Sequence, residues 1–76
     1  MKDFEVLIAS VPDREKTVAE IWFANTLIAE VSQERDSLEI DIYRGQRLTF
    51  KFDDLLGILE IAKNKLVGSD KPNWSL

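Results

Sequence analysis

Carboxylates are the side chains of this 76-residue chain that are best able to do chemistry, because the sequence contains no histidine and no cysteine. That absence excludes cysteine nucleophiles, histidine general bases, disulfides and zinc sites built from Cys or His. The serines have no histidine partner, and no GxGxxG, Walker-type or HExxH motif occurs. We therefore expect no catalytic residue, no cofactor and no enzymatic activity.

The acidic residues fall into groups with different expected roles. Asp53 and Asp54 precede an apolar run, so Asp53 suits the N-cap of a helix and both carboxylates suit its dipole. No loop has the Asp-rich spacing of an EF-hand, so we expect no metal site. Glu20, Glu30 and Glu39 instead lie within segments of strand-like alternation, and their role depends on how those segments pair.

The segments that must position these carboxylates are predicted to be strands followed by one helix. Apolar and polar residues alternate between turn signals, which predicts strands over residues 4–11, 18–23, 27–32, 37–43 and 48–52. A helix follows Asp53, its apolar stripe ends at Leu66, and Gly68 suits its C-terminus. The sequence predicts a single α+β domain over residues 1–68 and a tail over 69–76. This tail is either disordered or folded back so that Trp74 covers the sheet.

One set of registers gathers the large apolar residues of all the strands on one face. An antiparallel meander in chain order achieves this when Val6 pairs with Phe23, Ile21 with Ala29, Ala29 with Ile40, and Ile40 with Phe50. We expect the C-terminal helix to cover this inner face. Its predicted members are Phe4, Val6, Ile8, Ala19, Ile21, Phe23, Leu27, Ala29, Val31, Leu38, Ile40, Ile42, Leu48, Phe50 and Phe52.

The opposite, outer face follows from the same registers because side chains alternate along a strand. Glu20, Glu30 and Glu39 are predicted to lie abreast, beside a row that contains Trp22, Ile28 and Asp41. Like charges directly opposite each other are destabilising. The three predicted neighbouring glutamates therefore form either a solvated surface or a docking surface for a basic partner. In the second interpretation the predicted partner-binding residues are Glu20, Trp22, Ile28, Glu30, Glu39 and Asp41.

The same face allows other functions. Leu7, Trp22 and Ile28 form an apolar patch that suits a homodimeric structural or regulatory scaffold. The acidity also suits a phage-type inhibitor that imitates DNA. A formal net charge of −4 disfavours direct binding to nucleic acid or to an anionic membrane. The N-terminus carries acidic residues where a signal peptide would be basic, and no apolar run is long enough to span a bilayer. We therefore expect a cytoplasmic protein.

The string EIWFANTLIAEVSQERDSLEIDIY, followed by FDDLLGILEIAKNKL, resembles a group of small bacterial proteins. They are the immunity proteins encoded beside polymorphic or contact-dependent growth-inhibition toxins. The resemblance covers the chain from about Glu5 to Leu66, and it rests on the AEIW, AEVSQE and LEIDIY segments and on the FDD start of the helix. It implies that the protein neutralises one cognate toxin domain, often a nuclease, whose basic active site suits an acidic inhibitor. No contact residue transfers by motif.

Overall fold

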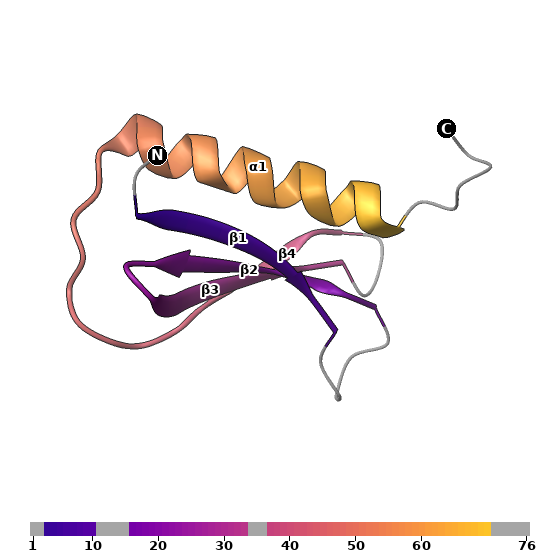
Figure 1. Cartoon of the computed structure of the whole chain (residues 1–76), viewed down its shortest axis with the longest axis horizontal. Coiled ribbons are helices and arrows are strands. Elements are labelled where there is room, and N and C mark those ends of the chain that lie inside the picture. Colours follow the sequence, from indigo (N-terminus) through magenta and orange to yellow (C-terminus); the bar gives the residue numbers. More distant parts are fainter. Residues whose placement is uncertain (1–2, 11–15, 34–36, 71–76) are drawn as a thin grey trace.

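The computed structural model describes residues 3–10, 16–33 and 37–70. It contains four strands, β1 (Phe4–Ala9), β2 (Val18–Phe23), β3 (Thr26–Ser32) and β4 (Glu39–Ile42), and one helix, α1 (Phe52–Asp70). The strands form one antiparallel sheet in the order β1-β2-β3-β4, and the helix lies across one face of it (Figure 1). The predicted α+β class, with an antiparallel sheet and a C-terminal helix, is confirmed.

The structure does not show the predicted fifth strand. Residues 43–51 have no regular secondary structure, and Phe52 is the first residue of α1. The segment arcs away from β4 toward the start of the helix (Figure 1). The ring of Phe50 packs against the rings of Phe4 and Phe23, with centroid distances of 5.0 and 4.8 Å. These aromatic contacts draw the segment toward β1 and β2 and leave β4 as an edge of the described sheet.

The β2–β3 hairpin resolves a conflict between its turn and its hydrophobic pattern. Ala24 and Asn25 both have positive φ, 48° and 67°, as a two-residue type I′ turn requires. This turn pairs Phe23 with Thr26, whereas we expected a three-residue connection. The apolar pattern nevertheless pairs Ile21 with Ala29, as predicted. The two registers differ by one residue, and a bulge between Ile21 and Trp22 absorbs the difference.

The other two strand pairs differ from the predicted registers by two residues. Val6 pairs with Ile21 rather than with Phe23, and Ala29 pairs with Ile42 rather than with Ile40. A shift of two residues keeps every side chain on its predicted face, because the side-chain period of a strand is two. For β1–β2 and β3–β4, the predicted faces of the strands are therefore right, although the predicted residue pairs are wrong.

The core lies between α1 and the first three strands. Ile58, Ala62 and Leu66 of the helix are buried, as the apolar stripe predicted, against residues of β1, β2 and β3. Among the described elements, α1 packs on β1, β2 and β3 and does not approach β4. The prediction of a fully covered inner face is therefore wrong in part. Six of its members remain exposed: Ile8, Leu38, Ile40, Ile42, Leu48 and Phe52.

The helix begins earlier and ends later than we expected. The N–H of Leu55 donates to the carbonyl oxygen of Lys51 at 3.1 Å, which places Lys51 at the cap. Asp53 lies within the first turn instead, where its charge still complements the helix dipole. The helix continues through Gly68 to Asp70, and Trp74 lies outside the described residues. No helix in the described part of the chain is both long enough and apolar enough to cross a membrane.

Candidate functional site

Three carboxylates meet in one cross-strand row on the outer face. Glu20 stands opposite Glu30, and Glu30 stands opposite Asp41. We call these three residues the acidic row. The sequence placed Glu39 at the end of this row, but the two-residue shift of β4 moves Glu39 opposite Ser32 and brings Asp41 in. Glu39 is exposed beside the row.

Two aromatic side chains donate hydrogen bonds to two of the three carboxylates of the acidic row. The indole Nε1 of Trp22 donates a hydrogen bond to Oε1 of Glu20 at 3.1 Å, and the hydroxyl of Tyr43 donates to Oε1 of Glu30. Both donors are neutral, so they orient the carboxylates without cancelling their charge. Sequence reasoning missed Tyr43 as a site residue. Its position two residues after Asp41, on the same face of the strand, is the signal that would have found it.

The ionisation of Tyr43 reflects the acidic row. Its hydrogen bond to Glu30 is the main cause that raises the pKa of Tyr43 from about 10 to about 12. Burial and the negative charges of Glu30, Glu20 and Asp41 raise this pKa further. The hydroxyl of Tyr43 therefore stays protonated at neutral pH and remains a donor. The negative potential of all three carboxylates converges at this side chain.

Ile28 does not belong to the outer face, which corrects the prediction that it is an apolar anchor. The β2–β3 bulge leaves Ile28 without a pairing partner in β2, and its side chain packs against the core. Leu27 takes the place opposite Trp22. The predicted site therefore keeps Glu20, Trp22, Glu30 and Asp41 together, with Glu39 beside them, and loses Ile28.

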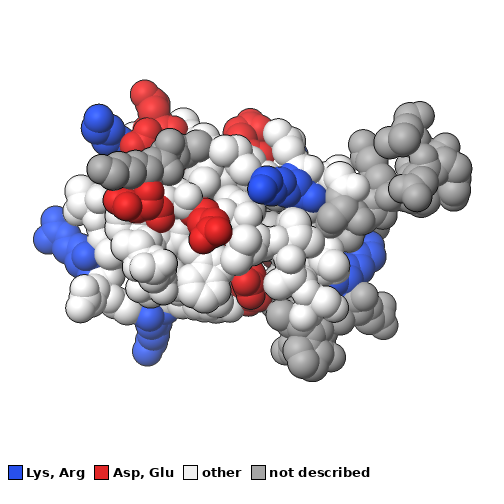
Figure 2. All heavy atoms as spheres, in the orientation of Figure 1, with Lys and Arg blue, Asp and Glu red and all other residues white. Residues whose placement is uncertain are grey.

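The accessible part of the outer face is centred on the acidic row. Val18 and Ser32 were expected on this face, but both are buried. Leu7 stands opposite Glu20 and is 42% exposed. Figure 2 views the molecule from the side, with α1 above the sheet, and most of the described surface there is uncharged; acidic side chains lie both at the upper edge and within the outline, and most basic side chains lie at the rim. Among the described residues, no group of three or more Asp and Glu side chains is arranged to hold a metal ion.

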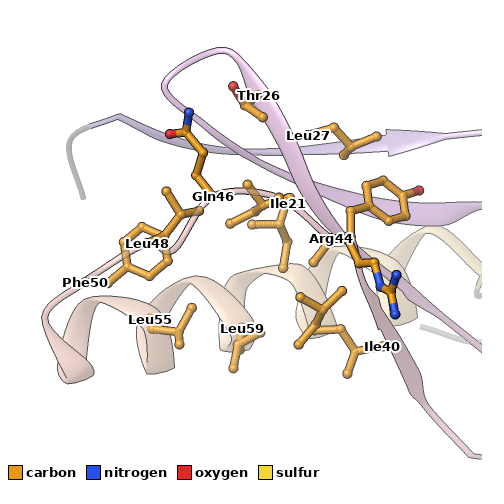
Figure 3. Close-up of a pocket in the computed structure, with 15 residues that line it drawn as sticks. Ile21, Thr26, Leu27, Ile40, Arg44, Gln46, Leu48, Phe50, Leu55 and Leu59 are labelled. Atoms are coloured by element: carbon orange, nitrogen blue, oxygen red, sulfur yellow. The ribbon is translucent and has the colours of Figure 1, made fainter.

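A second feature, an apolar groove of about 720 Å³, lies on the inner side of the sheet. Its walls are the inner faces of β3 and β4, the 43–50 segment and the first half of α1 (Figure 3). Among the described residues that line it, Arg44 is the only charged one. A smaller hollow of about 200 Å³ adjoins it and shares Ile40 and Leu59 with it. Sequence reasoning missed this groove because it expected a fifth strand to fill the space.

Comparison with known proteins finds no matching family model, no matching curated protein and no matching solved structure. The acidic row and the apolar groove are the two surface features of the described residues that a partner could recognise.

Proposed function

We propose that this chain is an immunity protein that binds a basic bacterial toxin domain, such as a nuclease, and neutralises it. The observation that carries the proposal is the acidic row. Glu20, Glu30 and Asp41 stand directly opposite one another on three adjacent strands. Each like-charged pair in such a row destabilises the free protein, and a partner's lysines or arginines would remove that repulsion on binding.

The local geometry supports a partner-binding role for these carboxylates. Trp22 and Tyr43 fix one oxygen each of Glu20 and Glu30 by hydrogen bonds. Carboxylates held in this way lose less rotamer freedom when they pair with a basic side chain. Trp22 is half-buried beside them, and tryptophan is enriched among the residues that dominate binding energy at interfaces. The resemblance to toxin-immunity proteins agrees with this chemistry.

The homodimeric scaffold has less support than the immunity function. It relied on an apolar patch of Leu7, Trp22 and Ile28, and Ile28 packs against the core instead. Two copies that met through this face would also bring acidic rows together. A DNA-mimic inhibitor would use the same carboxylates, so the identity of the partner distinguishes it from an immunity protein.

The proposal is tested by co-expressing the chain with the toxin domain encoded beside its gene, then measuring growth and the affinity of the purified complex. The double variant Glu30→Gln, Asp41→Asn should weaken binding by about tenfold or more and reduce its dependence on salt. The control Asp3→Asn, Glu60→Gln changes the net charge equally, at exposed sites outside the acidic row. It should change the affinity by less than about threefold.

Two results would overturn the proposal. The first is failure of the wild-type chain to restore growth when it is co-expressed with the toxin domain. The second is an equal loss of affinity in the two double variants, because net charge rather than the acidic row would then control binding.

A further inference from the structure

β4 is one of the two edges of the described sheet, opposite β1, and it has a neighbouring strand, β3, on one side only. Residues of an antiparallel strand direct their backbone groups alternately to one side and the other. The N–H of Tyr43 donates to the carbonyl oxygen of Ile28 at 2.9 Å, which assigns Tyr43, and with it Asp41, to the β3 side. Ile40 and Ile42 therefore direct their N–H and C=O groups to the open edge.

The side chains next to this edge are apolar on its inner side. Ile40 is 43% exposed and Ile42 is 75% exposed, and both line the apolar groove. The groove lies between β4 and the helix residues Leu55 and Leu59 (Figure 3). An added strand would place alternate side chains into this groove while its backbone bonded to Ile40 and Ile42. Edge and groove thus form one continuous surface.

The side chains on the outer side of the same edge are acidic. Glu39 and Asp41 are exposed, and Asp41 ends the acidic row at this edge. A second copy of β4 paired antiparallel here would place Asp41 opposite Asp41 or Glu39 of the other copy when its isoleucines face the groove. Like charges directly opposite each other are destabilising. The charge pattern therefore favours a strand with Lys or Arg on its outer side over a second copy of this chain.

The chain's own 43–51 segment does not occupy this edge. The ring of Phe50 packs against the rings of Phe4 in β1 and Phe23 in β2, away from the β4 edge. Leu48 lines the groove but is 44% exposed. The segment bounds the groove and leaves the backbone of β4 accessible.

We propose that the β4 edge accepts an extended strand of a partner protein, in which apolar residues alternate with lysine or arginine. The apolar residues enter the groove beside Ile40 and Ile42, and the basic residues continue the acidic row beyond Asp41. This inference deepens the proposed function and rests on it for the basic character of the partner. It names the mode of binding as strand addition.

The experiment uses the whole chain and the acetylated peptide Lys-Val-Lys-Ile-Thr-Val-Lys. Binding is measured by calorimetry, and amide hydrogen exchange is measured by NMR. The peptide should slow exchange at Ile40 and Ile42 by about tenfold or more and leave Asp41 and Tyr43, which already face β3, much less affected. A peptide in which glutamates replace the lysines should bind at least about tenfold more weakly.

Ile42→Pro tests the same backbone hydrogen bonds from the side of the protein, with Ile42→Val as its control. Proline removes an N–H that faces the open edge, and edge strands tolerate proline at such positions. It should reduce peptide affinity about tenfold or more, whereas Ile42→Val should change it by less than about threefold. If Ile42→Pro fails to fold, a peptide N-methylated on its bonding amides makes the same test with the wild-type protein.

Four results would overturn the inference. One is equal binding of the N-methylated and unmodified peptides. Another is protection of the groove side chains without slower exchange at Ile40 and Ile42. The third is self-association of the chain that Ile42→Pro abolishes, which would make a second copy the occupant. If the peptide fails to bind while the toxin is still neutralised through the acidic row, strand addition is wrong and the proposed function stands.

Discussion

Except at Ile8, the inner face of the sheet is buried or half-buried over β1 to β3, whereas it is exposed over β4, although the same alternation of apolar residues runs through all four strands. Ile21 in β2 is 1% exposed, whereas Ile42 in β4 is 75% exposed. The two residues belong to one cross-strand row, since Ala29 pairs with both. Alternation therefore decides which face a side chain occupies, and the position of the helix decides whether that face is buried.

The dimensions of helices and strands explain the difference. A helix with its side chains is about 10 Å wide, and neighbouring strands lie about 4.8 Å apart. One helix therefore covers two to three strands. In this chain α1 packs on β1, β2 and β3, and the aromatic contacts of Phe50 keep the preceding segment away from the fourth.

The largest expected effect separates the covered and open parts of the inner face. Ile21→Ala should lower the free energy of unfolding by about 2–5 kcal/mol, because it leaves a cavity under the helix. Ile42→Ala removes the same atoms from an exposed site and should change stability by no more than about 0.5 kcal/mol. Urea denaturation measures both. Similar losses in the two variants would mean that β4 is covered in solution.

A smaller effect is expected at the contact that keeps the 43–51 segment away from β4. Phe50→Leu preserves an apolar side chain but removes the ring contacts to Phe4 and Phe23, so it should lower stability by about 1 kcal/mol. Leu48→Ala is the matched control, since Leu48 lies in the same segment, is 44% exposed and has no aromatic ring. An unchanged stability of Phe50→Leu would show that the aromatic cluster does not hold the segment.

The sequence was sufficient to predict the sidedness of the strands but not the details of their pairing. Ile21 and Ala29 face the helix as expected, because a face depends only on alternation. Ile28 could not be placed correctly, since the bulge arises only when a two-residue turn meets an apolar pattern with a different register. A one-residue conflict moved this side chain from the predicted site to a half-buried position against the core.

The sequence predicted a row of three carboxylates on the outer face, and two of its three members were right. Glu20 and Glu30 pair as expected because the bulge lies beyond them in the hairpin. Asp41 replaces Glu39 because β4 pairs with β3 in a register two residues away from the predicted one, and alternation alone cannot distinguish these two registers. Phe50 was assigned to a strand because local alternation carries no information about ring contacts with residues far away in the sequence.

Removing one charge from the acidic row should stabilise the free protein. Glu30→Gln relieves repulsion with Glu20 and Asp41 and should raise the free energy of unfolding by roughly 0.2–1 kcal/mol at low salt. The gain should shrink as ionic strength rises, because the carboxylates are partly exposed. Urea denaturation at two salt concentrations measures it. Glu60→Gln on the helix is the control, and an equal gain there would contradict the assignment of repulsion to the row.

The titration of Tyr43 reports the same repulsion. Its pKa of about 12 in the folded protein lies above the ordinary value of about 10, so the folded state holds this proton more tightly than the unfolded state. The contribution of Tyr43 to stability is therefore full below pH 10 and is lost as the pH rises from about 10 to about 12. Tyr43 is the only tyrosine in the chain, so tyrosinate absorbance follows it directly. Glu30→Gln should lower this pKa toward 10, and an unchanged titration would contradict the hydrogen bond.

The smallest expected effect lies in the turn of the covered hairpin. Ala24 has a φ of 48°, a conformation that costs a residue with a Cβ about 1 kcal/mol. Ala24→Gly removes that strain. Glycine also has greater conformational freedom in the unfolded chain, which lowers the free energy of unfolding by roughly 0.5–1 kcal/mol. The net gain in stability should be no more than about 0.5 kcal/mol, and Asn25→Ala, its counterpart at a φ of 67°, should lose a similar amount. Both residues are exposed although the strands they join are among those the helix covers. A loss above about 2 kcal/mol in either variant would mean that the turn, and not burial under the helix, limits the stability of this half of the sheet.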